Sequence, residues 1–400
     1  MNIQTNNGTD PATGNFALFN LSFRIFFLSA GLFSIISIGL WSAVYLFGVQ
    51  LSIQNLSSSQ WHAHEMIYGY AFAVIAGFLL TAAKNWTGIQ TIHGKPLALM
   101  FALWALARIL FLVGTPYIEL AAIFDTGFSL IFIVALAHPI LKAKQWKQLA
   151  LVFKIVLLAI FNILFYLGAT GTIMQGVNWG IYGGLFLVIS LILMLGRRVV
   201  PFFIEKGVNR QVKLRNSKWI DLGSLVLFLS FTIVEVFFTQ PALSAYLALI
   251  LFAINARRLM GWYTPGIWQK SLLWSLYLAF WFLTVGFALL AASYFLGINK
   301  SLAIHAFAVG GIGAMTLAMM SRVALGHSGR GIHSPPRAMA YAFGLLLIGA
   351  VVRVFLPLFD TGHYTLWVGI SQLLWVVAYS IFGVIYLPIL SKARIDGRPG

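Results

Sequence analysis

The chain has 400 residues, of which 60% are hydrophobic and 9% are charged, and its mean hydropathy is +0.90. A globular protein of this length needs more charged and polar surface than this composition provides. The composition therefore excludes a soluble protein and indicates an integral membrane protein. The chain contains no cysteine, which excludes disulfides, thiolate-ligated clusters and covalently attached c-type haem.

Apolar runs of about 20 residues, each long enough to cross a hydrocarbon core of about 30 Å, follow one another along the whole chain. Twelve such runs predict an all-α, polytopic membrane protein with twelve transmembrane helices. The approximate spans are 24–49, 62–83, 96–113, 117–139, 149–168, 176–199, 219–238, 242–260, 268–295, 302–325, 337–357 and 363–391.

The 26 Lys and Arg residues are concentrated in the connections after the even-numbered helices, whereas the connections after the odd-numbered helices contain only Lys300. By the positive-inside rule both termini are cytoplasmic, and the net charge of +17 reflects topology and anionic lipid rather than nucleic acid. The first apolar run is too long for a signal peptide, so we expect it to be retained. We therefore expect cytoplasmic tails over 1–22 and 392–400 around one twelve-helix domain, 23–391.

Weak internal similarity suggests that this domain is built from repeats. Sliding the chain by 241 residues superposes His64 on His305 and Gly69 on Gly310, which lays the second helix on the tenth. A shift of eight helices keeps the orientation the same, so three parallel four-helix units are expected, the middle one being the most diverged. The expected units are 23–141, 149–260 and 268–391.

Polar residues inside the membrane each cost a few kcal/mol unless they are paired or hydrated. With the predicted topology, they all fall in the outer halves of their helices, at about the depth of His64 and His305. These residues are Glu65, Arg108, Glu119, Asp125, Glu235 and Arg353.

Two interpretations of these polar residues remain open. In the first, Arg108 and Arg353 pair with carboxylates of neighbouring helices and hold the bundle together. In the second, His64 and His305 are the axial ligands of a haem, and the two arginines neutralise its propionates near the outer surface.

His62, His64 and Glu65 open the second helix, and their spacing restricts which of them act together. Residues two apart on a helix diverge by about 200°, so His62 and His64 cannot both ligate one iron from a regular helix. His62 and Glu65, three apart, share a face. If His64 binds haem, His62 is free for a second metal or a proton path, with Glu65 orienting it. A histidine at a helix start is also an ordinary interfacial hydrogen-bonding residue.

On the cytoplasmic side, His327 lies in a glycine-rich turn that corresponds to the turn around Gly88. Glycine at a helix C-cap explains both turns without any ligand. Convergence of His327 with His93, His138 and His333 would instead suit copper. We treat His62, Glu65, His327 and His363 as candidate copper ligands or as residues that orient such ligands.

Several short motifs along the chain resemble the signatures of the NnrS family. They are FRIFFL at 23–28, WHAHEM at 61–66, AGFLLTA at 76–82, NWTG at 85–88, GRR at 196–198 with PFF at 201–203, and MMSRVALGHSG at 319–329. The resemblance runs from about residue 20 to residue 390.

This resemblance implies a bacterial inner-membrane protein that contains non-covalent, b-type haem and copper and is associated with denitrification and the response to nitric oxide. A weaker, architectural resemblance is to the large subunit of the haem-copper oxidases, which also has twelve helices with haem ligands on the second and tenth. The present chain departs from that pattern, because its sixth and seventh helices contain no histidine.

Two functions from different classes follow. In the first, a haem held by His64 and His305, with Arg108 and Arg353 on its propionates, binds or processes nitric oxide or a related gas at the membrane. In the second, the chain is a twelve-helix secondary transporter whose buried Arg, Glu and His residues form a substrate or proton path. The sequence identifies no catalytic residue and no electron donor.

Overall fold

The computed structural model describes residues 17–51, 53, 55–238 and 240–397, and the described part is helical and contains no strands. Twelve helical segments are long and apolar enough to cross a membrane, and each corresponds to one predicted span. The predicted all-α, twelve-span architecture is therefore confirmed, and the chain is a multi-pass membrane protein in contact with the lipid bilayer. The three pseudo-repeats remain a prediction.

The first six spans are built from seven α-helices and one π-helix, with short 3-10 turns in two connections. Their bounds are α1 Ser22–Phe47, α2 Ser58–His64, η1 Glu65–Ala71, α3 Phe72–Thr87, α4 Gly94–Val113, η2 Thr115–Tyr117, α5 Ile118–Lys142, η3 Trp146–Gln148, α6 Leu149–Ala169 and α7 Gly176–Gly207.

The last six spans contain the second π-helix. Their bounds are α8 Lys218–Phe237, α9 Pro241–Trp262, η4 Pro265–Gln269, α10 Ser271–Phe295, α11 Lys300–His305, η5 Ala306–Gly313, α12 Ala314–His327, α13 Ala338–Val354, α14 Leu356–Phe359 and α15 Tyr364–Ser391.

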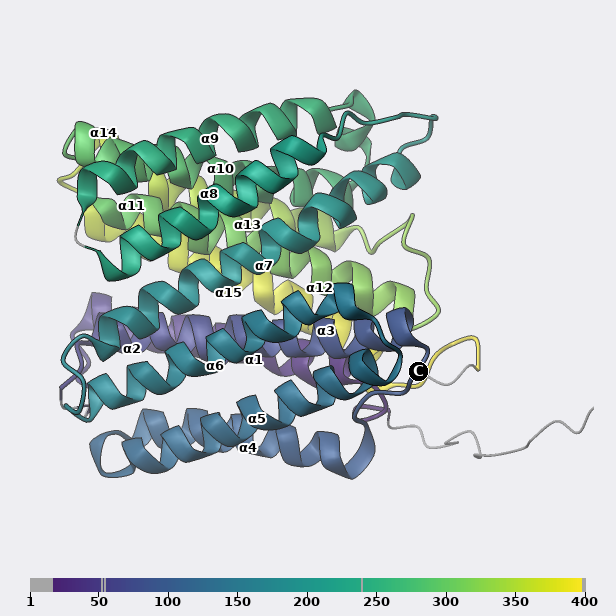
Figure 1. The fold of residues 1–400 in the computed structure, drawn as a ribbon, viewed down its shortest axis with the longest axis horizontal. Coiled ribbons are helices and arrows are strands. Elements are labelled where there is room, and N and C mark those ends of the chain that lie inside the picture. The colour runs from purple at the N-terminus through teal and green to yellow at the C-terminus, as the bar shows by residue number, and fades with distance from the viewer. Residues whose placement is uncertain (1–16, 52, 54, 239, 398–400) are drawn as a thin grey trace, which may run out of the picture.

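The helices run side by side along one direction, with α4 and α5 at one edge of the bundle and α8 and α9 at the opposite edge (Figure 1). Between these edges, α1 packs against α3 and α15, and α7 packs against α6, α8 and α10. Large apolar side chains such as Ile123, Val134 and Val384 are exposed on the outside of the bundle. In water such a surface would be unfavourable, but it matches the hydrocarbon region of a bilayer.

The first and last helices are tied together at the end of the bundle where the described chain begins and ends. The Ala17 backbone N–H donates to the Ser391 carbonyl at 2.8 Å. The fully buried Arg24 donates from Nη1 to the carbonyls of Ile389 and Leu390, at 3.3 and 3.0 Å. These carbonyls belong to the last turn of α15 and have no partner within the helix, so Arg24 satisfies them. We call this end the terminus end and the opposite one the cavity end.

The two π-helices interrupt the second and tenth spans directly after His64 and His305. The shift that superposes these two histidines also superposes the starts of η1 and η5. A π-helix inserts an extra residue per turn and frequently marks a functional site. Both π-helices therefore indicate a candidate functional site in the region where α2 and α11 enter the bundle.

The sixth span is longer than its sequence predicts. The basic residues at 197–198 and Pro201 predict a helix end near residue 199, but α7 continues to Gly207. The extension packs on α10, because Gly207 lies against Leu273 and Gly196 against the ring of Phe280. Tertiary packing thus outweighs the hydrogen bond that Pro201 removes from the helix.

Candidate functional site

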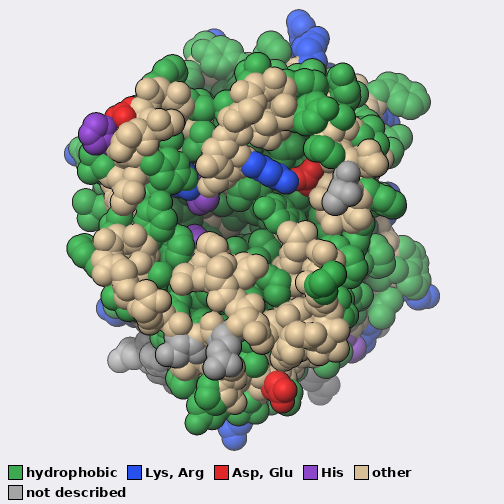
Figure 2. Space-filling view, turned by 90° about the vertical axis from the view of Figure 1, so that its left-hand side faces the viewer, with side chains coloured by type: hydrophobic (Ala, Val, Ile, Leu, Met, Phe, Trp, Pro, Cys, Tyr) green, Lys and Arg blue, Asp and Glu red, His purple; other side chains and the backbone are tan. Residues whose placement is uncertain are grey.

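A cavity of about 700 Å³ opens at the cavity end of the bundle. Its walls come from α1, α2, η1, α7, α11, η5, α13 and α15. Figure 2 looks onto this end and shows a hollow in which histidine side chains are visible, with a basic side chain at its rim. The volume lies within the range of about 300–1,000 Å³ that is typical of small-molecule and cofactor sites. Its polar lining includes His62, His305 and Arg353.

His305, the last residue of α11, presents one free ring nitrogen. Its Nδ1 lies 2.7 Å from the Ser301 carbonyl oxygen, one turn earlier. A carbonyl can only accept, so Nδ1 carries the proton and Nε2 keeps its lone pair. A neutral histidine fixed in this way, through a backbone carbonyl, is the usual form of a metal-ligating imidazole.

Arg353 on α13 lies against this imidazole. Its Nη2 is 3.1 Å from Ser301 Oγ, and it is 3.2 and 3.3 Å from the two ring nitrogens of His305. A group nearly equidistant from both nitrogens lies over the ring and leaves the in-plane lone pair of Nε2 free. Its Cζ is 5.3 Å from the centre of the Tyr364 ring, a cation–π distance.

Arg353 has no anionic partner among the described residues. Its side chain is buried, none of the ion pairs in the described part of the chain includes it, and its Nη1 makes no hydrogen bond there. A buried, unpaired cation is strongly unfavourable. Arg353 also lines the cavity, so its charge is available to an anionic group there.

His62 on α2 faces the same cavity from the other side. Its ring stacks on that of Trp41 on α1, with centroids 4.8 Å apart and planes inclined by 8°. Its Nδ1 is buried and, within the described residues, has no hydrogen-bond partner. His62 and His305 thus bring two imidazoles with uncommitted nitrogens to one cavity.

His64 lies outside the cavity lining, in a buried polar cluster between α2, η1, α4, α5 and α6. Its Nδ1 is 2.9 Å from Glu65 Oε1, and its Nε2 is 2.9 Å from Asn162 Oδ1. The Asn162 amide is oriented by its Nδ2, which donates to Asp125 Oδ2 at 2.9 Å. Both ring nitrogens of His64 therefore face oxygen acceptors.

Arg108 completes this cluster by donating to Glu65 Oε1 at 2.7 Å and to Asp125 Oδ2. Both ring nitrogens of His64 are therefore engaged by oxygen atoms, and neither is free to ligate a metal. The Arg108 guanidinium lies between the two buried carboxylates, and buried charges are stable only when they are paired in this way. Of the two interpretations of the arginines, pairing with carboxylates holds for Arg108 and does not hold for Arg353.

The four candidate copper residues are not brought together. Glu65 pairs with His64 and Arg108 instead of orienting His62. His327 lies at the terminus end, where its ring contacts Phe23. His363 is exposed before α15 and bonds to Asp360. Among the described residues, no group of three His, Cys, Asp or Glu side chains is placed to hold a metal ion.

Three residues that shape these sites were absent from the sequence-based candidates: Trp41, Asn162 and Ser301. Asn162 could have been recognised from the sequence, because it is a single amide within an apolar span and such a side chain requires a buried hydrogen-bond partner. Trp41 and Ser301 could not, since aromatic and hydroxyl side chains are common near the ends of membrane helices.

Fold and site together define a polytopic α-helical membrane protein with a histidine- and arginine-lined cavity that opens at one end of the bundle. The chain belongs to the NnrS family: the family model described as NnrS protein matches residues 17–394, nearly its whole length. This membership fits a protein of the nitric oxide response. No curated protein matches the chain, and the architectural resemblance to the haem-copper oxidase large subunit is not supported by these matches.

Proposed function

We propose that this chain is a haem-binding inner-membrane protein of the nitric oxide response, and that the haem occupies the cavity at the cavity end. One observation carries the proposal: His62, His305 and the unpaired Arg353 line the same cavity of about 700 Å³. Imidazole is a common axial ligand of haem iron. Arginine is the residue best suited to pair with a carboxylate, and each haem carries two propionates.

The proposal keeps His305 and Arg353 from the sequence-based prediction and replaces His64 with His62. Both ring nitrogens of His64 are hydrogen-bonded, and the residue lies outside the cavity lining. His62 lines the cavity, and its Nδ1 has no hydrogen-bond partner among the described residues. Arg108 is likewise replaced, since both ends of its guanidinium are occupied by Glu65 and Asp125. We propose no copper site, because no residue set in the described part of the chain fits one.

When bound, haem would supply a redox-active iron with affinity for diatomic gases. The protein's own residues have separate tasks. His305 is held by the Ser301 carbonyl, so it would be the more rigid of the two residues that hold the iron. His62 stacks on Trp41 and its Nδ1 has no hydrogen-bond partner among the described residues, so it would be the more mobile one. Apolar lining residues such as Ile181 and Leu185 keep the surroundings low in dielectric.

The test is absorption spectroscopy on protein purified from haem-replete cells. We expect a Soret band that is lost or shifted in His62→Ala and in His305→Ala but retained in His64→Gln. His363→Ala is the matched control, because His363 is exposed and outside the cavity lining. Nitric oxide added to the reduced protein is expected to change the spectrum. A colourless preparation would overturn the proposal, and a haem spectrum indifferent to nitric oxide would overturn its gas-binding part.

A second candidate function, secondary transport of an anionic solute, is favoured by two observations. The cavity contains an arginine without an anionic partner among the described residues, and the π-helices interrupt two spans at corresponding positions. π-Helical turns within α-helices frequently occur at functional sites. Uptake of labelled anions into proteoliposomes by the haem-free protein would support this candidate, and haem at one equivalent per chain would exclude it.

A further inference from the structure

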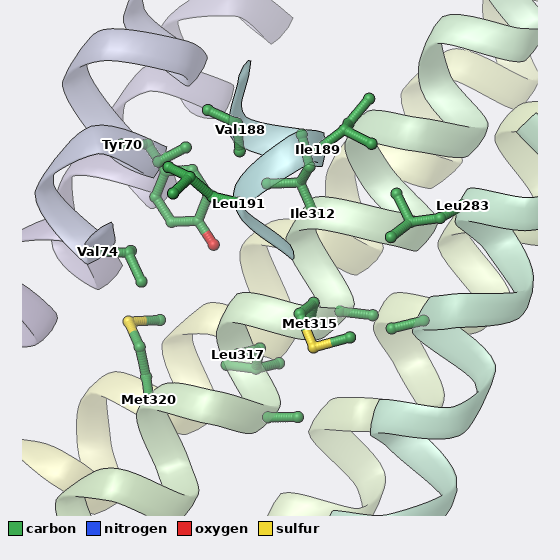
Figure 3. Packing of buried hydrophobic residues seen from close by; sticks show 14 of the residues in the cluster. Tyr70, Val74, Val188, Ile189, Leu191, Leu283, Ile312, Met315, Leu317 and Met320 are labelled. Carbon is green, nitrogen blue, oxygen red and sulfur yellow. The ribbon is translucent and has the colours of Figure 1, made fainter. Parts of the chain in front are cut away.

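A second, smaller cavity lies between α3, α7 and α12, and we call it the apolar crevice. Its free volume is about 80 Å³, and its walls include Val74, Leu191 and Met315. Figure 3 shows these side chains around the space between the helices. The one polar residue in the lining is Thr316, whose hydroxyl donates to the Ile312 carbonyl of its own helix at 2.6 Å. The crevice therefore offers an entering molecule almost only hydrocarbon.

The apolar crevice adjoins the large cavity. Ala71 and Val188 line both spaces. Away from this junction the lining includes Ile75, Phe78 and Val199, which are only partly buried. The crevice thus extends from the site that holds His62 and His305 to apolar side chains that are accessible in part.

Size and polarity select the occupant. Small apolar cavities stay dry and take up apolar molecules such as xenon or benzene. A charged or hydrogen-bonding solute would lose several kcal/mol on entering, because nothing there replaces its hydrogen bonds to water. A space of about 80 Å³ is roughly half the engineered cavity of about 150 Å³ that binds benzene. It therefore suits a molecule of two or three heavy atoms, and it excludes a lipid or prenyl chain.

We propose that the apolar crevice binds small, uncharged, apolar gas molecules and passes them between the hydrocarbon region and the large cavity. The identity of the gas that is used at the cavity rests on the proposed function. The crevice itself requires no haem, since its selectivity comes from Val74, Leu191, Met315 and their apolar neighbours. Because apolar gases concentrate in hydrocarbon, a route from the lipid would supply the cavity without passing the polar rim.

Xenon is the probe for the first experiment, a structure of the purified protein determined under xenon pressure. We expect xenon in the apolar crevice of the unaltered protein and its loss in Val188→Phe, which places a larger ring at the junction. The matched control is Val384→Phe, at a site 77% exposed on the outside of α15. Xenon in the large cavity but not in the crevice would overturn the proposal, as would lipid or detergent density there.

A second measurement tests passage in the haem-loaded protein. After photolysis of carbon monoxide from the reduced protein in vesicles, rebinding from the bilayer is expected to be several-fold slower in Val188→Phe and unchanged in Val384→Phe. Equal rates would overturn the passage. Should Val188→Phe fail to fold, Ala71→Leu fills the same junction and takes its place. The two proposals fail in different experiments. A colourless protein would contradict haem binding, whereas the absence of xenon from the apolar crevice would contradict gas binding there.

Discussion

His62 and Trp41 stack face to face, with ring centroids 4.8 Å apart and planes inclined by only 8°. Stacking fixes the plane of an imidazole but, unlike a hydrogen bond, occupies neither of its nitrogens. His64 two residues later also stacks, on Phe165 with centroids 4.2 Å apart, but both nitrogens of its ring are hydrogen-bonded. Of the two histidines of α2, the one whose Nδ1 has no partner among the described residues is the candidate ligand.

Removing the stacking partner is expected to loosen His62 without unfolding the bundle. Aromatic pairs contribute about 0.5–1.5 kcal/mol beyond their buried area. Trp41→Leu should therefore weaken haem retention by up to about tenfold, and Trp41→Phe should retain most of it. The haem-to-protein ratio after dilution and the position of the Soret band are the measurements. The control is Trp219→Leu, because Trp219 is 82% exposed; equal losses in both variants would contradict the role of Trp41.

Arg353 is predicted to hold the anionic part of whatever occupies the cavity. A hydrogen bond to a charged group contributes about 1.5–3 kcal/mol, so Arg353→Leu should weaken haem binding roughly ten- to a hundredfold. Arg353→Lys should lose less, because the positive charge remains. Titration of the apoprotein with haem measures the effect. An unchanged affinity of Arg353→Leu for haem would contradict the proposed contact between Arg353 and a haem propionate.

Arg108 is predicted to matter for stability rather than for binding. Breaking a buried ion pair by removing one partner costs about 3–5 kcal/mol, because the other charge stays buried and unpaired. Arg108→Leu leaves both Glu65 and Asp125 without their guanidinium partner, so its unfolding temperature in detergent should fall markedly. Arg198→Ala removes an exposed charge and is the control. An unfolding temperature of Arg108→Leu equal to that of the unaltered protein would contradict the predicted contribution of this cluster to stability.

Gly310 in η5 is predicted to tolerate no side chain. A Cβ there would lie 2.2 Å from the ring of Phe282, and overpacking of this kind costs about 1–3 kcal/mol. Gly344 in α13 has nothing within 4 Å of the corresponding position. Gly344→Ala should be neutral or stabilising by up to about 1 kcal/mol, since alanine is the better helix former. Thermal unfolding of both variants tests this, and equal effects would contradict it.

His363 is predicted to have a local effect only. Its ring donates to Asp360 in the connection before α15, which lowers the pKa of the Asp360 carboxyl. The stabilisation from a lowered pKa is complete above the unfolded-state value of about 3.9 and is lost as the pH falls through the folded-state value. His363→Ala should thus lower the unfolding temperature only slightly, because the pair is exposed, and by the same amount from neutral pH to about pH 5. A loss that appears only at acidic pH, or a large loss at neutral pH, would contradict this prediction.

The twelve spans could be predicted from sequence, because hydrophobic length acts locally along the chain. Which face of a helix meets a cavity could not. His62 and His64 point in different directions, and the side chain that decides between them is Asn162, 98 residues beyond His64 on α6. Nothing in the sequence of α2 itself distinguishes the two.

Arg108 and Arg353, which the sequence predicts to share one role, differ in their surroundings. Only Arg108 has carboxylates within reach among the described residues. The residue that corresponds to Glu65 in the tenth span is Ala306, and α15, which follows Arg353, contains no acidic residue. The two arginines differ because their neighbouring residues differ. Arg108 has a structural position between carboxylates, whereas Arg353 has no carboxylate partner among the described residues and is available to a ligand.

The contact between Arg24 and the last turn of α15 joins residues 365 positions apart in the chain. At about 5–20 residues per second, a ribosome needs on the order of 20–70 seconds to synthesise that interval. Throughout it, the Arg24 guanidinium, in the first turn of α1, depends on water and headgroups at the membrane surface for its hydrogen bonds. The end of the bundle that holds both termini is therefore completed only after the last span has been synthesised.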